Sequence, residues 1–244
     1  MKTNFRLCAS SLQQKNTKKS QNKLGMSCSF FADEKASDIN LCIVEFGLEY
    51  AYSDKHKNAI CDLIYEAIKK VGKPKIQSNQ KVLFIGVGNP NFTADCFGVC
   101  VSKRIYSKLY LSTQNSSTKF KFYYFNPDIR AKTGLDTITL TNLVIDEVSP
   151  DIIFLFDCYA TKHNNRVGRV VEVKNKALRP ASAVEGYDDK IVSKNGAIII
   201  SIGAVLLKVS KNGQMLSMQT NADLLTARIS ECVADAVCGV LNEL

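Results

Sequence analysis

The stretch 81-KVLFIGVGNPNFTADCFGVCVSKRIY-106 passes from a strand through a glycine-containing turn into a helix. KVLFIGVG is a continuous apolar run, as found in strands covered on both faces. A helix is predicted to follow from about Asp95 to Leu109. Such a turn often cradles a phosphate, but the dinucleotide fingerprint needs a third glycine where Asn91 stands, and an acid about 20 residues further on. The turn instead delivers Asp95 to the end of the strand.

The rest of the chain alternates between strand and helix patterns. The predicted strands are INLCIVEFGL, FKFYYF, DIIFLFD, RVVEV, AIIISIGAVLLKVS and GQMLSMQT. The predicted helices are SDKHKNAICDLIYEAIKKVG, ITLTNLVIDEV and NADLLTARISECVADAVCGVLNEL. This alternation predicts βαβ units and a largely parallel sheet, which is an α/β fold.

Charge is concentrated at the start of the chain. Of 244 residues with a net charge of +9, the first 32 include six basic residues and no acid. Lacking apolar periodicity, residues 1–35 are predicted to be a flexible basic leader, with a removable pro-segment or a weak nucleic-acid arm as sharper alternatives. Residues 36–244 form one predicted domain. No stretch approaches the roughly 18 apolar residues needed to span a bilayer, so no membrane partner is expected. No specific nucleic-acid site is evident in the sequence either.

The cysteines indicate a reduced, cytoplasmic protein. There are nine, an odd number, with no Cys-x-x-Cys spacing, and several lie inside apolar patterns, where cysteine serves as a small apolar residue. His56 and His163 are the only histidines, and neither is at ligand spacing from a cysteine pair. We therefore expect no metal and no organic cofactor.

Two acids follow strands that are predicted to be parallel. Asp95 comes a short loop after VLFIGVG, and Asp157 ends DIIFLFD. In open α/β sheets, ligands bind beyond the carboxyl ends of the strands. Taken singly, Asp95 is best explained as a helix cap. Taken together, the acids could converge and share a proton, one activating water while the other polarises a carbonyl.

A cysteine-based alternative uses the neighbours of these acids. Cys96 and Cys158 each follow one aspartate, and His163 could serve as a base. A neighbouring carboxylate raises the pKa of a thiol, which disfavours a nucleophilic cysteine. The aspartate hypothesis is therefore preferred.

GVGNPNFTADCFG resembles the germination protease motif Gly-Asn-x-Asn-x-Thr-x-Asp-x-x-Gly. The matching positions are Gly88, Asn89, Asn91, Thr93, Asp95 and Gly98. KTGLDT resembles the family's Thr-Gly-x-Glu-Thr loop through Thr133, Gly134 and Thr137, with Asp136 for glutamate. SPDIIFLFDCYATKHNNRV resembles a third segment of the family. Its matches are Pro150, Asp151, Asp157, Ala160, Arg166 and Val167.

The resemblance covers about residues 81–203 and implies an aspartate-dependent endopeptidase with Asp95 and Asp157 as catalytic residues. Its implied fold is a three-layer α/β/α arrangement with a mostly parallel sheet, similar to hydrogenase maturation proteases. The implied substrates are small acid-soluble proteins that coat spore DNA, cleaved during germination in the spore core. A removable pro-segment is also implied, and a homo-oligomer is left open.

Residues around the acids have simpler alternative roles. Asn89, Asn91 and Thr93 could hydrogen-bond around Asp95, or only form the turn. Arg166 could balance Asp157 or be solvated.

The chain also departs from the family. The family's glycine-rich loop corresponds to 179-RPASAVEG-186 in this chain, where three of the family's glycines are replaced. Backbone conformations with positive φ are therefore costly in this loop. Two rival functions therefore stay open. One is a non-catalytic relative that binds without cutting, and the other is a metal-assisted maturation protease, for which only His163 is near Asp157 in sequence.

Overall fold

The parallel half of the sheet comes from the strands that the apolar runs predict. The structure, a computed structural model, describes residues 17–23, 25–32, 39–72, 76, 79–113, 120–178, 191, 196–210 and 216–243. Four strands lie in the order β5-β4-β6-β8, and all their pairings are parallel. They are β4 (Lys81–Gly86), β5 (Lys121–Phe125), β6 (Ile152–Thr161) and β8 (Ile198–Val209). The predicted α/β fold with a parallel core is confirmed.

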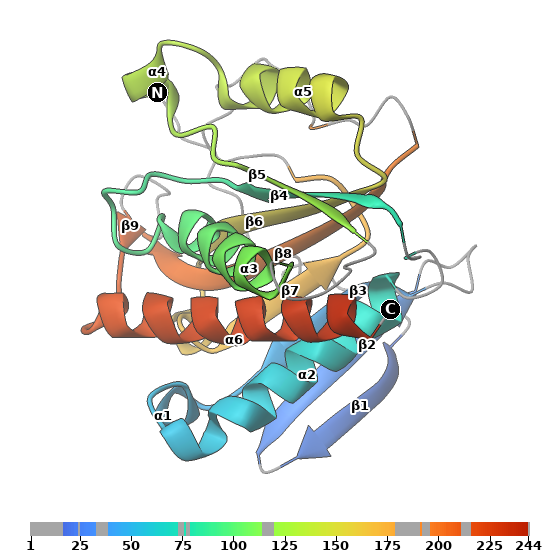
Figure 1. The fold of residues 1–244 in the computed structure, drawn as a ribbon. Coiled ribbons are helices and arrows are strands. Elements are labelled where there is room, and N and C mark those ends of the chain that lie inside the picture. The colour runs from blue at the N-terminus through green and yellow to red at the C-terminus, as the bar shows by residue number, and fades with distance from the viewer. Residues whose placement is uncertain are drawn as a thin grey trace.

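Helices cover both faces of this sheet (Figure 1). One face is covered by α2 (Asp54–Gly72), α3 (Phe97–Thr113) and α6 (Ala222–Asn242), and the other by α5 (Thr137–Val148). The short helices are α1 (Leu48–Ala51), α4 (Arg130–Thr133) and the 3-10 turn η2 (Asn164–Arg166). Asp136 caps α5, its carboxylate accepting from the N–H groups of Ile138 and Thr139, as its position before the helix predicts.

An antiparallel half extends the sheet beyond β8. Its strands follow in the order β7, β3, β2 and β1, each antiparallel to its neighbour, and β9 pairs with β8 on the side. They are β1 (Thr17–Lys23), β2 (Met26–Ala32), β3 (Ile39–Glu45), β7 (Val170–Lys174) and β9 (Leu216–Ser217). The predicted parallel arrangement therefore holds for the core of the sheet and not for this half.

The prediction of a flexible leader over residues 1–35 is wrong for its second part. Strand β2 pairs with β3 from Ser27 to Ala32, and Met26, Cys28 and Phe30 are buried against α2 and its neighbours. The physical reason is a period-2 pattern, in which alternate residues of 26-MSCSFFA-32 face the core. Strand β1 adds to β2. Residues 1–16 and 33–38 lie outside the described part of the chain.

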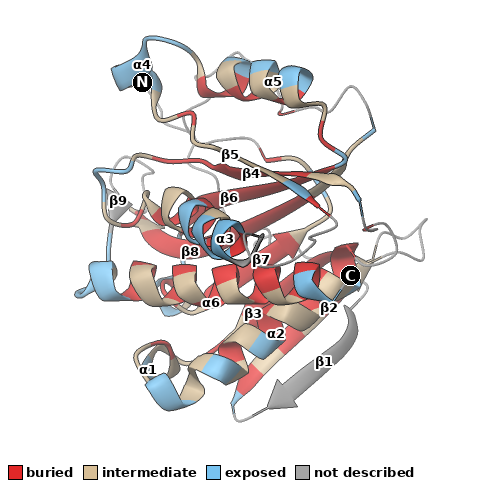
Figure 2. Ribbon diagram, viewed as in Figure 1, coloured by how far each residue is buried: buried red, intermediate tan, exposed pale blue. Residues whose placement is uncertain are grey.

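Two apolar clusters lie on opposite faces of the sheet. Along β6, Phe154 and Phe156 join the cluster under α2, α3 and α6, while Ile153 and Leu155 join the cluster under α5. Figure 2 shows β4, β6 and β8 buried along most of their length, whereas α5 exposes its outer side. In the described ranges, no helix combines the length and apolar character needed to cross a membrane.

Candidate active site

The turn after β4 folds back onto Asp95. Gly88 has φ +127°, and a Cβ there would overlap the carbonyl oxygen of Asp95. The Asn89 N–H donates to Asp95 Oδ2 at 2.7 Å. The carboxylate is thus held by the turn that precedes it and does not cap α3, which begins at Phe97. The helix-cap explanation of Asp95 is not supported.

Asp157 lies inside β6, at the point where β4 ends. The last β4 rung pairs Gly86 with Phe156, and the Val87 N–H donates to Phe156 O at 2.9 Å. Asp157 is the next residue along β6 and is only 4% exposed. The prediction that the strand stops at Asp157 is wrong, because β8 continues beside β6 and pairs with it as far as Thr161. The carboxylate still follows the end of the neighbouring parallel strand.

Burial and the charges of both acids raise the pKa of one group, the thiol of Cys158. Burial raises its pKa well above the usual range, and the charges of Asp157 and Asp95 add to that rise in this order. The first turn of α3 packs closely against β6 and the residue that follows β4, because a Cβ on Gly98 would overlap the carbonyl oxygens of Phe156 and Val87. The loop after β4, the start of α3 and the middle of β6 therefore meet at one place.

The carboxyl group of Asp95 is shifted toward its neutral form. Burial raises its pKa above the usual range, and the hydrogen bond from the Asn89 main chain opposes that rise. A carboxyl group with this balance holds its proton to higher pH than an exposed aspartate. Such a group can donate a proton as well as accept one.

The polar residues of the turn mainly build it. Asn89 Oδ1 accepts from the Asn91 N–H at 3.0 Å, and the Thr93 carbonyl accepts from Cys96 Sγ at 3.0 Å. Asn89 also positions Asp95 through its main chain, as described above. Turn formation, the simpler of the two predicted roles, is what these contacts show.

Three other predicted site residues make contacts elsewhere. Thr133 Oγ1 bonds to the main chain of Ile129 and Leu135, and Gly134 ends α4 with φ 72°. Arg166 Nη1 pairs with Glu45 Oε1 at 3.0 Å. The structure therefore gives Arg166 a partner on β3.

The thiols beside the acids are held neutral. The pKa of Cys96 is raised to about 12, first by burial, and that of Cys158 is raised as described. His163 is exposed in the turn after β6. These observations argue against a nucleophilic cysteine at this place.

Glu172, a buried carboxylate on the same face of the sheet as Asp157, was not predicted from the sequence. Asp157 pairs across to Gly203 on β8, which pairs with Glu172 on β7. Glu172 is fully buried, and its Oε2 lies 2.6 Å from Lys174 Nζ. Lys174 Nζ also lies 4.7 Å from the ring centre of Tyr159, and that ring occupies the space a Gly203 Cβ would need. Acid and lysine two residues apart in a strand share a face, a signal that could have revealed the pair.

Asn126 is a second residue that the sequence analysis missed. It follows β5, and with its amide nitrogen as donor it bonds Gly86 O at 3.1 Å and Ser102 Oγ at 3.0 Å. It thereby ties β5 to the glycine turn and to α3. Among the described residues, no group of three or more His, Cys, Asp or Glu side chains is arranged to hold a metal ion.

These features define an α/β protein with two carboxylates beyond the last rung of β4, one in the turn that follows β4 and one in the neighbouring parallel strand β6. The sequence profile of the Germination protease family matches residues 51–212. The chain therefore belongs to the germination protease family.

Individual relatives match over part of their length. The germination protease of Caldanaerobacter subterraneus subsp. tengcongensis is 28% identical over 134 residues, which is 53% of this chain and 41% of the relative. That of Clostridium tetani is 25% identical over 157 residues, covering 62% and 48%. The chain thus spans about half the length of these relatives. A [NiFe] hydrogenase maturation protease from Thermococcus kodakarensis aligns with a TM-score of 0.36 and 16% identity, covering 66% of this chain and 93% of the other.

Proposed function

We propose that the chain is an aspartate-dependent endopeptidase, with Asp95 and Asp157 as its catalytic pair. The observation that carries the proposal is that both acids lie just beyond the last rung of β4: Asp157 directly follows the β6 residue paired with Gly86, and the turn after β4 holds Asp95 through the Asn89 N–H. Membership of the germination protease family supports the same class of reaction.

The proposed reaction needs one proton on the pair. The ionised member of the pair takes a proton from a water molecule as the water oxygen attacks the scissile carbonyl carbon. The protonated member donates its proton to the carbonyl oxygen. Collapse of the tetrahedral species breaks the C–N bond, and a proton passes to the leaving nitrogen. Because closely placed carboxyls titrate as a pair, the proton is assigned to the pair and not to one member. The raised pKa of Asp95 supports a pair that keeps this proton.

The proposed substrates are the small acid-soluble proteins that coat spore DNA, cleaved in the spore core during germination. This part rests on the family alone, as do a homo-oligomer and activation by removal of a pro-segment. Any such segment would have to end before β2, because Met26, Cys28 and Phe30 belong to the core. The loop at residues 179–186, where family glycines are replaced, lies outside the described residues.

Cleavage of a small acid-soluble spore protein by the purified chain tests the proposal. Asp95→Asn and Asp157→Asn should each lower the rate by about 10²–10⁴-fold, the range for loss of a general acid or base. Both variants should keep the circular dichroism spectrum of the parent. Cys96→Ala and Cys158→Ala are the matched controls and should stay active. Equal product patterns from the parent and Asp95→Asn would end the protease proposal, and binding without cutting would favour the non-catalytic relative.

A further inference from the structure

The side chain of Asn126 joins three elements next to the proposed catalytic acids. Its amide nitrogen lies 3.1 Å from the carbonyl oxygen of Gly86 and 3.0 Å from Ser102 Oγ. The nitrogen is also 3.1 Å from the carbonyl oxygen of Phe125, and the amide oxygen accepts from the Tyr124 hydroxyl. Carbonyl oxygens accept hydrogen bonds and never donate them, so the nitrogen must be the atom of the amide that faces them. Asn126, which follows β5, therefore donates to the end of β4 and to α3.

Ser102 carries this contact into α3 and toward Asp157. It is fully buried, and its hydroxyl donates to the carbonyl oxygen of Gly98 at 2.9 Å. Gly98 packs so closely on β6 that a Cβ there would overlap the carbonyl oxygen of Phe156. Phe156 directly precedes Asp157. The hydrogen bonds of Asn126 therefore reach the backbone next to Asp157.

Gly86 carries the contact toward Asp95. It is the last residue of β4, and a Cβ on it would overlap Ser102 Oγ. The turn begins at the next residue, and its Asn89 N–H donates to Asp95 Oδ2 at 2.7 Å. Asn126 therefore holds the carbonyl group from which this turn starts.

An aromatic stack fixes the other end of the Asn126 side chain. The ring of Tyr124 lies 5.5 Å from that of Tyr106 in α3, at an interplanar angle of 27°, and the ring of Tyr106 lies 6.0 Å from that of Tyr110. These separations are those of favourable offset stacking. The stack holds the Tyr124 hydroxyl in place, so the Asn126 amide has one orientation that satisfies its neighbours.

We propose that Asn126 is a positioning residue that fixes Asp95 and Asp157 relative to each other, an inference that rests on the proposed function. Through the Gly86 carbonyl it holds the turn that carries Asp95. Through Ser102 it holds the part of α3 that packs on β6, the strand that carries Asp157. Asn126 acts through these groups and not on the substrate.

The spacing of the acids matters because the proposed pair shares one proton. Repulsion between two carboxylates falls with distance, so acids that move apart hold the shared proton less firmly. A displacement of about 1 Å can lower a rate by about 10²-fold even when the substituted residue is away from the chemistry. Loss of the Asn126 donors should therefore slow the chemical step and change substrate binding little.

Steady-state cleavage of a small acid-soluble spore protein measures the effect. Asn126→Asp keeps the size of the side chain but loses both N–H donors, so kcat should fall about 10²-fold with KM changed less than about twofold. Ser102→Ala is a milder change that removes only the hydroxyl, and its kcat should fall about 10-fold. Tyr124→Phe leaves both Asn126 donors in place and should remain close to the parent.

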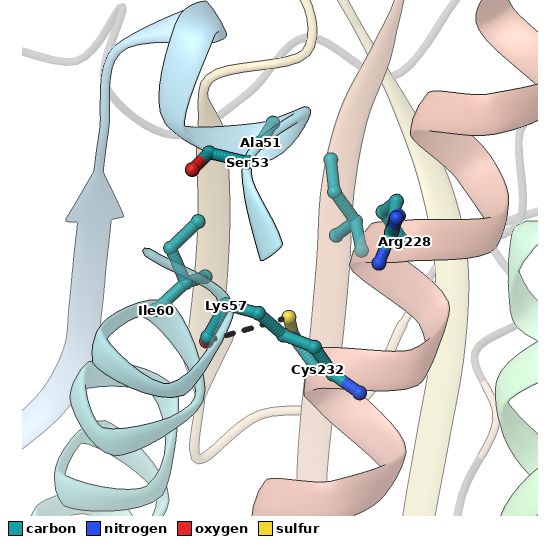
Figure 3. Close-up of a pocket in the computed structure, with 7 residues that line it drawn as sticks. Ala51, Ser53, Lys57, Ile60, Arg228 and Cys232 are labelled. Carbon is teal, nitrogen blue, oxygen red and sulfur yellow. Dashed lines mark hydrogen bonds between the residues drawn. The ribbon is translucent and has the colours of Figure 1, made fainter. Parts of the chain in front are cut away.

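A hydrogen bond between two helices away from the acids provides the matched control. Cys232 is 3% exposed, and its Sγ donates to the Lys57 carbonyl oxygen at 3.8 Å, joining α6 to α2 beside a small cavity (Figure 3). Like the Asn126 amide, this thiol is a side-chain donor to the main chain of another element. Cys232→Ala should lower the melting temperature and leave kcat unchanged, because neither acid lies on these helices. A fall in kcat as large as that of Asn126→Asp would overturn the proposal.

Amide hydrogen exchange tests the positioning without any peptidase activity. The Asn89 N–H, which donates to Asp95 Oδ2, should exchange several-fold faster in Asn126→Asp than in the parent. The N–H of Leu155, in the buried centre of β6, should stay protected, because the opening is local. Equal acceleration at both amides, or none at Asn89, would show that Asn126 only stabilises the fold and would overturn the proposal. A parent that cuts no substrate would end the proposed function alone, since the exchange result stands by itself.

Discussion

The two halves of the sheet place polar groups in different ways. In the parallel half, β4 and the part of β6 that pairs with it are apolar, and both acids follow the last β4 rung, Asp157 within β6 itself. In the antiparallel half, β2 alternates buried with half-buried residues, and β7 pairs its buried Glu172 with Lys174 of the same strand. The comparison teaches that parallel strands gather their site at one edge, while antiparallel strands stabilise the fold along their whole length.

The largest expected effect comes from removing the outer strands of the antiparallel half. Deleting residues 1–32 removes the buried side chains of Met26, Cys28 and Phe30. At about 1.5–3 kcal/mol for each of these three apolar side chains, the loss is about 4.5–9 kcal/mol, comparable with the whole stability of many domains. Urea unfolding monitored by circular dichroism measures it. Deleting residues 1–16 is the control, and equal midpoints for the two truncations would show that β2 contributes nothing.

The strand that joins the two halves should give the next effect. Lys174→Met leaves the fully buried Glu172 without its 2.6 Å ion pair, a loss of about 3 kcal/mol in unfolding free energy. The double variant Glu172→Gln, Lys174→Met should recover most of it, because no buried charge remains. Chemical denaturation of both variants decides. A double variant no better than the single one would contradict the charge-based explanation.

A glycine at the edge of the parallel half should give a smaller loss of stability with a clear loss of function. Gly88→Ala forces a Cβ into the Asp95 carbonyl oxygen at a φ of +127°. The expected cost is about 2 kcal/mol, together with reduced proteolysis because Asp95 moves. Gly134→Ala is the matched control, since its φ is +72° but nothing lies within 4 Å of the added Cβ. Equal activities of the two variants would argue that the turn does not position Asp95.

The smallest effect concerns the charge of Asp95. Because burial raises its pKa in the folded state, the folded protein binds this proton more tightly than the unfolded chain. Stability from this group is present below its unfolded pKa and is lost as pH rises through the folded pKa. Asp95→Asn should therefore unfold at a higher temperature than the parent at pH 7, with the difference closing as pH falls toward 4. A parent that is the more stable at pH 7 would reverse the sign of this argument.

Local patterns account for the parallel half. Continuous apolar runs predicted β4 and β6, the position of Asp136 predicted a helix start, and the glycine turn predicted an acid at a strand end. Each of these depends on residues within a few positions of one another, which the sequence displays directly. The same reasoning selected Asp95 and Asp157, and it excluded a dinucleotide site on the missing glycine at Asn91.

The sequence by itself determined the α/β class and singled out the two acids as the site prediction, because turns and periodicities are local. Only the tertiary structure decided that β2 joins the sheet, that Arg166 pairs with Glu45, and that Asp157 lies beside the end of β4. These partners lie far apart in the chain, and their energies come from burial and charge pairing that exist only after folding. The short alternating segment 26-MSCSFFA-32 becomes a strand because β3 pairs with it and α2 packs against its buried side chains.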